Sequence, residues 1–133
     1  MTLIEYFEQK RGVGVLATAN AEGKVDTAVY SAPHVCADGA LAFIMRERLT
    51  HLNVQSNPYG SYIFIEEGFG RKGLRLFLEK LKEDQDPDLI AAMTRRYLTP
   101  EEDREKGPKF LVYFKVEKIL PLIGSGDTNI TLA

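Results

Sequence analysis

Short apolar segments, separated by turns that contain glycine, asparagine or aspartate, constrain the fold of this chain more than any other feature. The turns fall at residues 20–23, 37–39 and 67–70. Each lies between runs rich in β-branched and aromatic residues, which is typical of hairpins. No helix alternates regularly with these runs. The sequence therefore favours an antiparallel barrel, with helices packed outside it or across its ends, over a parallel sheet.

Alternating polarity marks the individual strands. In residues 59–66, Tyr62 and Phe64 fall on one face, and Ile63 and Ile65 fall on the other. In the next run the apolar register shifts at Leu81, which predicts a bulge or the end of the strand. We expect about six strands, at residues 13–19, 24–32, 41–45, 59–66, 72–82 and 109–122.

Helix-start signals occur at four places. A threonine followed three residues later by a glutamate has the spacing of a capping box, and an aspartate before a proline also marks a helix start. These signals are Thr2 with Glu5, Thr99 with Glu102, and Asp86 with Pro87. They predict helices over residues 2–10, over 87–97, and from 99 to near 107. A fourth helix is expected over 50–56, opened by Thr50 as its N-cap and stopped before Pro58.

Residues 40–58 place positive charge beside this fourth helix. Arg46 and Arg48 follow the apolar run ALAFIM, and Thr50 comes next. A helix N-terminus has unpaired N–H groups and a partial positive charge, so the combination suits a phosphate. A capped helix without any ligand explains the same residues, and local chemistry leaves both interpretations open.

The composition bounds the class of protein. The 133 residues predict a single domain over 1–133, with 124–133 as a flexible tail. A net charge of −2 gives no reason to expect a nucleic-acid partner, and the one cysteine, Cys36, fits a reducing compartment. We find no signal peptide and no run near the ~20 apolar residues of a membrane helix. The sequence thus predicts a soluble, cytoplasmic protein.

Other constellations point to no catalytic group. His34, Cys36 and Asp38 are close in sequence, but they offer too few convergent ligands for a metal. His51 either touches a phosphate or relays a proton beside Thr50, or is a solvated first-turn histidine. The chain has no P-loop, GxGxxG motif or serine elbow.

Several segments carry a family resemblance through their order and spacing. They are GVGVLATANAEGKVDTAVYSAP, ALAFIM, RERLTHLNVQSNP, GRKGLRLFLEKLKE, DPDLIAAM and FLVYFKVEKILPLIG. Over nearly the whole chain they resemble the FMN-binding split barrel of the pyridoxamine 5′-phosphate oxidase-like superfamily. The resemblance implies a mainly β (α+β) fold, an antiparallel split β-barrel with peripheral helices.

The same resemblance implies an FMN site at a homodimer interface. It makes Arg46, Arg48 and Thr50 the phosphate ligands, with Leu49 in the same turn. The residues that would flank the isoalloxazine ring are Ala28, Val29, Tyr30 and Ser31, and those on the ribityl side are Phe43 and Ile44. The partner chain would contribute residues near Lys72, Gly73 and Arg75. Phe69, in its glycine-rich turn, is a further candidate for contact with the ring.

The chain departs from the family pattern at two places. Leu49 stands where the family usually has a basic residue, and residues 124–133 contain no arginine or histidine, the residue types with which pyridoxamine phosphate oxidases bind substrate. We therefore expect a flavin-dependent oxidoreductase of another specificity, with a nicotinamide or a deazaflavin as possible electron donor. The alternatives are a non-enzymatic flavin carrier and a haem-binding module with His34 or His51 as axial ligand.

Overall fold

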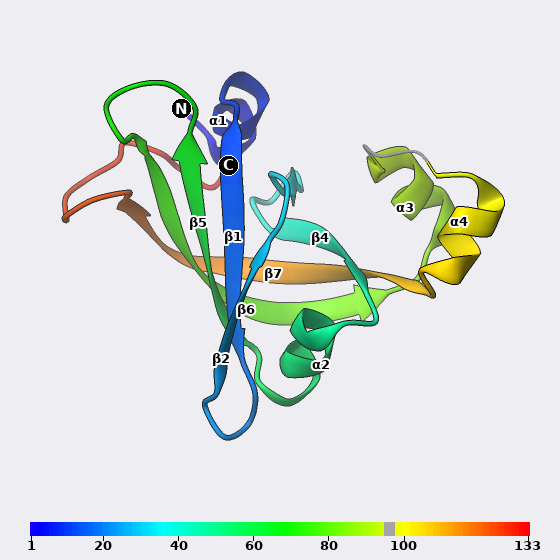
Figure 1. Cartoon of the computed structure of the whole chain (residues 1–133). Helices are drawn as coiled ribbons and strands as arrows, with labels where there is room; N and C mark the ends of the chain where they lie inside the picture. The colour runs from blue at the N-terminus through cyan, green and yellow to red at the C-terminus, as the bar shows by residue number, and fades with distance from the viewer. Residues whose placement is uncertain (95–97) are drawn as a thin grey trace.

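The computed structural model describes residues 1–94 and 98–133 (Figure 1). In this part of the chain seven strands form one antiparallel sheet in the order β2-β1-β5-β6-β7-β4-β3. The strands are β1 (Gly12–Ala19), β2 (Val25–Val29), β3 (His34–Val35), β4 (Leu41–Arg46), β5 (Tyr59–Glu66), β6 (Gly73–Asp84) and β7 (Lys109–Pro121). The helices are α1 (Leu3–Gln9), α2 (Leu49–Ser56), α3 (Pro87–Met93) and α4 (Pro100–Glu105). This architecture confirms the predicted split barrel.

A short connection explains why the sheet curls. β2 and β3 are the two edges of the sheet, yet only residues 30–33 join them. At strand spacings of about 4.8 Å a flat sheet of this size would be about 29 Å wide. The chain from Val29 to His34 can span at most about 18 Å. The two edges must therefore approach each other, which closes the barrel on one side.

Aromatic and leucine side chains fill the interior of the barrel. Tyr62, Phe64 and Phe114 are fully buried, and Phe43 packs against both Tyr62 and Phe114. α1 covers one end and buries Leu3, Tyr6 and Phe7 against this core. Its capping box forms as expected, with Thr2 and Glu5 exchanging hydrogen bonds. None of the described helices is long and apolar enough to span a membrane.

Most predicted elements agree with the structure, including the predicted irregularity, which lies in β6. β5 has the predicted limits, and the register shift at Leu81 corresponds to a bulge between Lys80 and Lys82. β2 is shorter than predicted because the chain leaves β1 after Tyr30 to reach β3 at the opposite edge, a two-residue strand that we did not predict. The predicted end of α3 at Tyr97 lies outside the described residues.

The start of α2 differs from the prediction. Thr50 is not the N-cap: that position belongs to Arg48, and the helix begins at Leu49. A tight turn in which the Arg48 N–H donates to the Arg46 carbonyl at 2.9 Å moves the N-cap two residues earlier. Thr50 is consequently carried into the first turn and is buried.

The C-terminal residues contact the rest of the domain. The described residues 122–133 form no strand, but Thr131 pairs with the N-terminus through hydrogen bonds to Met1 and Leu3 of 3.0 and 2.8 Å. Ile130 packs against the main core. The end of the predicted tail is thus attached to the start of α1.

Candidate functional site

Polar side chains dock α2 onto the barrel. Of its four buried residues, Thr50, His51 and Asn53 are polar, and only Val54 is apolar. The Asn53 side chain donates to the Thr18 hydroxyl at 3.1 Å, which ties the helix to β1. A short helix fixed in this way has its ends placed by specific hydrogen bonds rather than by apolar packing alone.

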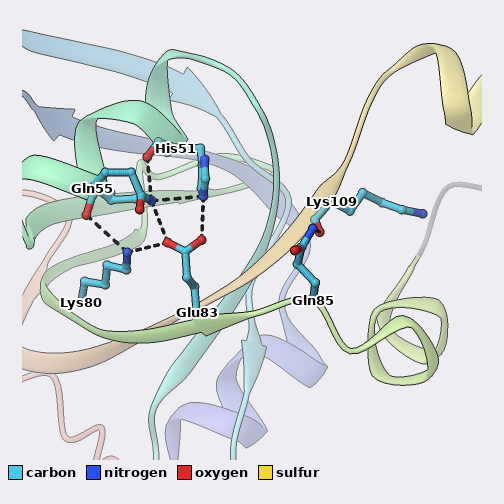
Figure 2. Close-up of polar contacts among 7 residues, drawn as sticks. His51, Gln55, Lys80, Glu83, Gln85 and Lys109 are labelled. Atoms are coloured by element: carbon cyan, nitrogen blue, oxygen red, sulfur yellow. Dashed lines mark hydrogen bonds and ion pairs between the residues drawn. The ribbon is translucent and has the colours of Figure 1, made fainter.

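A polar cluster surrounds one carboxylate on β6 (Figure 2). Glu83 Oε2 lies 2.8 Å from His51 Nε2, and Glu83 Oε1 accepts from Gln55 Nε2 at 2.6 Å and from the Lys80 ammonium. Burial would raise the pKa of Glu83, but the hydrogen bonds from Lys80, Gln55 and His51 outweigh burial and lower that pKa to about 2. We call Glu83, His51, Gln55 and Lys80 the Glu83 cluster.

His51 is held on more than one side. Its ring stacks on Phe110 with centroids 4.0 Å apart and planes 14° from parallel. Because an ionised carboxylate only accepts hydrogen bonds, the Nε2 atom that faces Glu83 carries a proton. The expectation of a solvated histidine is therefore wrong: the side chain is almost fully buried.

The N-terminus of α2 has free backbone donors. The first helical hydrogen bond runs from the Leu52 N–H to the Arg48 carbonyl. The N–H groups of Leu49, Thr50 and His51 donate to no acceptor among the described residues, as expected of a first helical turn. Arg48 is exposed beside them. Among the described residues, its guanidinium hydrogen-bonds only to the Glu47 carbonyl, at 3.3 Å. Free N–H groups and an exposed guanidinium together fit a phosphate.

The other arginine of this turn serves a different role. The Arg46 guanidinium pairs with the Asp103 carboxylate at 2.6 Å and donates to the Gly107 carbonyl at 2.7 Å. Lys109 contacts the same carboxylate at 3.0 Å. Because α4 has no buried residue, these contacts hold it against the barrel. Arg46 would have to leave them in order to bind a phosphate.

β2 presents unpaired backbone groups along the edge of the sheet. The Tyr30 N–H donates to the Gly14 carbonyl and the Asn20 N–H to the Lys24 carbonyl, both at 3.0 Å. Hydrogen-bonded pairs alternate along an antiparallel ladder, so Thr27 and Val29 direct their N–H and C=O groups away from β1. Such an edge can bind the polar rim of a flat heterocycle.

Tyr30 connects this edge with the start of α2. Its ring is half-buried and meets Phe43 edge to face, with centroids 5.8 Å apart. Burial raises the pKa of Tyr30, a hydrogen bond with the Thr50 side chain opposes the rise, and the charge of Asp26 adds to it. The structure therefore brings Tyr30 and Thr50 together. Of the neighbouring candidates, Val29 and Ser31 are exposed.

Phe43 and Ile44 lie on opposite faces of β4. Phe43 is buried inside the barrel, whereas Ile44 packs beside Ile90 of α3 on the outside. Since successive side chains of a strand alternate, the two cannot line one surface together. The Phe43 side chain is therefore not available to a ligand outside the barrel, and its backbone pairs with Val112 of β7.

The remaining candidates lie at the far end of the sheet. β5 leads from α2 to the β5–β6 turn, so its full length separates the start of α2 from Lys72 and Gly73 (Figure 1). Arg75 donates to the carbonyls of Pro121 and Gly124 at 2.9 and 2.5 Å. Phe69, in the turn, is fully exposed. Within one chain these residues therefore lie away from Arg48 and the free N–H groups at the start of α2.

Two hollows flank the C-terminal segment. They have volumes of about 330 and 340 Å³ and share Thr128 and Ile130 as lining residues. The larger one is also lined by Lys72 and Gly73. Neither of these two hollows is lined by a residue of α2.

An apolar surface covers the outer face of β2, β1, β5 and β6. The cross-strand register aligns Val29, Val15 and Ile63 in one row, and Val13 and Ile65 in the next. Val29 is 76% exposed and Val13 is 56% exposed, and Phe77 extends the surface onto β6. Exposed apolar patches of this kind mark interaction surfaces. We call this surface the outer sheet face.

Glu83, Gln55 and Asn53 belong to the site, yet sequence reasoning did not single them out. Glu83 lies 32 residues after His51, and only the pairing of β6 with β7 beside α2 brings them together. The apolar register shift at Leu81 was the one available signal, because the bulge there is what changes the faces of the residues that follow.

Comparisons with known proteins support the fold. No family model matches the chain, and no curated protein matches its sequence. Among solved structures, an FMN-binding protein from Syntrophomonas wolfei subsp. wolfei is 18% identical, with 92% of this chain and 85% of that chain covered and a TM-score of 0.72. An F420 reductase is 15% identical (90% and 97% covered, TM-score 0.68), and HutZ, a haem storage protein from Vibrio cholerae, is 22% identical (95% and 98% covered, TM-score 0.64). At such low identities the likeness establishes the split-barrel fold alone.

Proposed function

We propose that this protein binds FMN at the junction of α2 and β2 and uses it for electron or hydride transfer as a homodimer. The observation that carries the proposal is the combination of free N–H groups at Leu49, Thr50 and His51 with the exposed Arg48 guanidinium. The resemblance of the chain to flavin-binding split barrels and the fold shared with an FMN-binding protein support it.

Two elements would bind different parts of the cofactor. Arg48 and the first turn of α2 would hold the phosphate, while the free backbone edge of β2 at Thr27 and Val29 would face the ring. Ala28, Tyr30 and Ser31 would flank the ring beside this edge. The flavin, once bound, supplies the redox chemistry, and the protein orients it and tunes its potential through hydrogen bonds to the ring. Arg46, which is paired with Asp103, would act by holding α4 rather than by binding the phosphate.

A second copy of the chain would complete the site. The outer sheet face includes the exposed edge of β2, so an interface there would bring partner residues to the ring. Residues near Lys72, Gly73 and Arg75 are distant from α2 within one chain and are candidates for this contribution. Apolar faces of this kind are typical of stable homodimers.

An absorption spectrum of the purified protein tests the proposal, followed by reconstitution with FMN. The expected result is the pair of bands of an oxidised flavin, bleached by dithionite and restored by air. Excess NADH or NADPH under anaerobic conditions then separates an enzyme with a nicotinamide donor from a flavin carrier. A colourless protein that fails to bind added FMN would remove the flavin proposal.

Haem is the second candidate, because HutZ, a haem storage protein, shares the fold. An axial ligand would have to be His34 or His51. His34 is exposed on the edge strand β3, and His51 directs Nε2 to Glu83. Neither geometry favours haem over FMN. A Soret band in the absorption spectrum of the purified protein would make haem the first candidate instead.

A further inference from the structure

We propose that Glu83 and His51 are positioning residues for the phosphate end of the flavin site, an inference that rests on the proposed FMN site. α2, which carries the free N–H groups, has only eight residues. Helices shorter than about 12–15 residues are marginally stable alone. Its N-cap, Arg48, makes no capping hydrogen bond through its side chain. Contacts with the barrel must therefore set the direction of these N–H groups.

The strongest of these contacts converge on Glu83. One carboxylate oxygen lies 2.8 Å from His51 Nε2 in the first turn of α2, and the other accepts from Gln55 at 2.6 Å in the second turn. The carboxylate thus holds two successive turns of the helix against β6. Hydrogen bonds to a charged group are roughly twice as strong as neutral ones, so this anchor is stronger than the Asn53–Thr18 contact.

His51 transmits this anchoring to the helix start. Its backbone N–H is one of the three free donors, and its ring is fixed between the Glu83 carboxylate and the face of Phe110. A side chain fixed on two sides restricts the backbone that carries it. The position of the N–H groups offered to a phosphate therefore depends on a carboxylate that does not touch the phosphate.

The charge of Glu83 does not oppose an anion nearby. The Lys80 ammonium contacts the same oxygen as Gln55 and also approaches the Val54 carbonyl at 3.4 Å. The cluster therefore contains a compensating cation, and His51 adds a second proton donor. Among the described residues, Lys80, Gln55 and His51 are the groups that face the carboxylate.

Comparison of FMN with riboflavin isolates the phosphate end. Glu83→Gln should weaken FMN binding about three- to tenfold, the range for part of the interaction between an anion and a helix N-terminus, because the N–H groups would no longer be aligned with the phosphate. Riboflavin binding should be unchanged. The ³¹P resonance of bound FMN should shift in Glu83→Gln, because the phosphate environment changes. The matched control is Glu66→Gln, which removes a carboxylate bonded to Tyr6 at the opposite end of β5 and should alter neither quantity.

A milder variant covers the case in which Glu83→Gln fails to fold. Gln55→Ala keeps the Glu83 carboxylate but removes its contact with the second turn, together with the Gln55 contacts to His51, and should move the FMN-to-riboflavin affinity ratio in the same direction. If the wild type binds FMN and riboflavin equally tightly, the proposed phosphate site fails, and this inference fails with it. If the wild type prefers FMN but neither variant changes that preference or the ³¹P resonance, the positioning role alone is overturned.

Discussion

The Tyr62 hydroxyl donates a hydrogen bond to the Tyr30 carbonyl at 3.0 Å, and Gly14 leaves the space through which it passes. A Cβ atom at Gly14 would lie 1.7 Å from the Tyr62 oxygen. The bond joins β5 to the end of β2, on the far side of β1. It fixes the point at which the chain leaves β1, and therefore the residues that we propose beside the flavin ring.

Replacing Gly14 by alanine should destabilise the protein by about 1–3 kcal/mol or more, as expected of an overpacked core. The Tyr62 ring would have to move, and the Tyr30 carbonyl would lose its donor. Denaturant unfolding measures the loss. Gly60→Ala is the control, since its Cβ would come no closer than 3.1 Å, to the Ala17 carbonyl, and would meet Thr18 and Leu16 at ordinary contact distances. Equal stability losses in the two variants would contradict the role assigned to Gly14.

Removing the two arginines near α2 should have different effects. Arg48→Ala should weaken FMN binding by about 1.5–3 kcal/mol, the range for a hydrogen bond to a charged group, and leave riboflavin binding unchanged. Arg46→Ala should instead release α4, because it breaks the ion pair with Asp103. Fluorescence titration measures the first effect, and limited proteolysis between α3 and β7 measures the second. Loss of FMN affinity in Arg46→Ala alone, with α4 still protected, would reverse the two assignments.

Local patterns predicted the elements of this fold well. Alternating polarity located β5, capping boxes located α1 and α4, and the break in the pattern at Leu81 corresponded to a real bulge. Each of these signals lies within a few consecutive residues. They depend on strand and helix periodicity or on cap chemistry, which act locally.

The site was less predictable because its contacts join distant residues. Thr50 has the chemistry of an N-cap, but the turn between Arg46 and Arg48 takes the helix start away from it. Arg46 looks like a phosphate ligand until α4, which follows 54 residues later, supplies Asp103. No residue near His51 in the sequence predicts its contact with Glu83. Ion pairs of this kind are decided by the tertiary fold, after local structure is set.

The outer sheet face should hold two copies of the chain together. A charge introduced by Ile65→Glu would be buried at such an interface without a partner, so we expect the dimer to weaken at least about tenfold. Sedimentation velocity over a concentration series measures the change. Leu89→Glu is the control, because Leu89 is similarly exposed but lies on α3. A wild-type protein that sediments as a monomer while holding flavin would remove the dimer from the proposal.

The Glu83 cluster should make stability fall in acid over a defined range of pH. The pKa of Glu83 is about 2 in the folded protein, whereas a glutamate without these contacts, as in the unfolded chain, has a pKa of 4.5. The folded state therefore favours the ionised carboxylate. The resulting stabilisation is complete above about pH 4.5 and is lost as the pH falls towards 2. It amounts to about 3 kcal/mol at most, from a shift of this size.

Glu83→Gln should therefore be less stable than the wild type at pH 6, and the difference should shrink towards pH 2. Urea unfolding at intervals between pH 2 and 7 measures the two profiles. Glu22→Gln, at the exposed turn between β1 and β2, should follow the wild type throughout, because Glu22 pairs with the exposed Lys24 on the surface. A constant difference between Glu83→Gln and the wild type across this range would mean that the Glu83 carboxylate is not stabilised by its partners in solution.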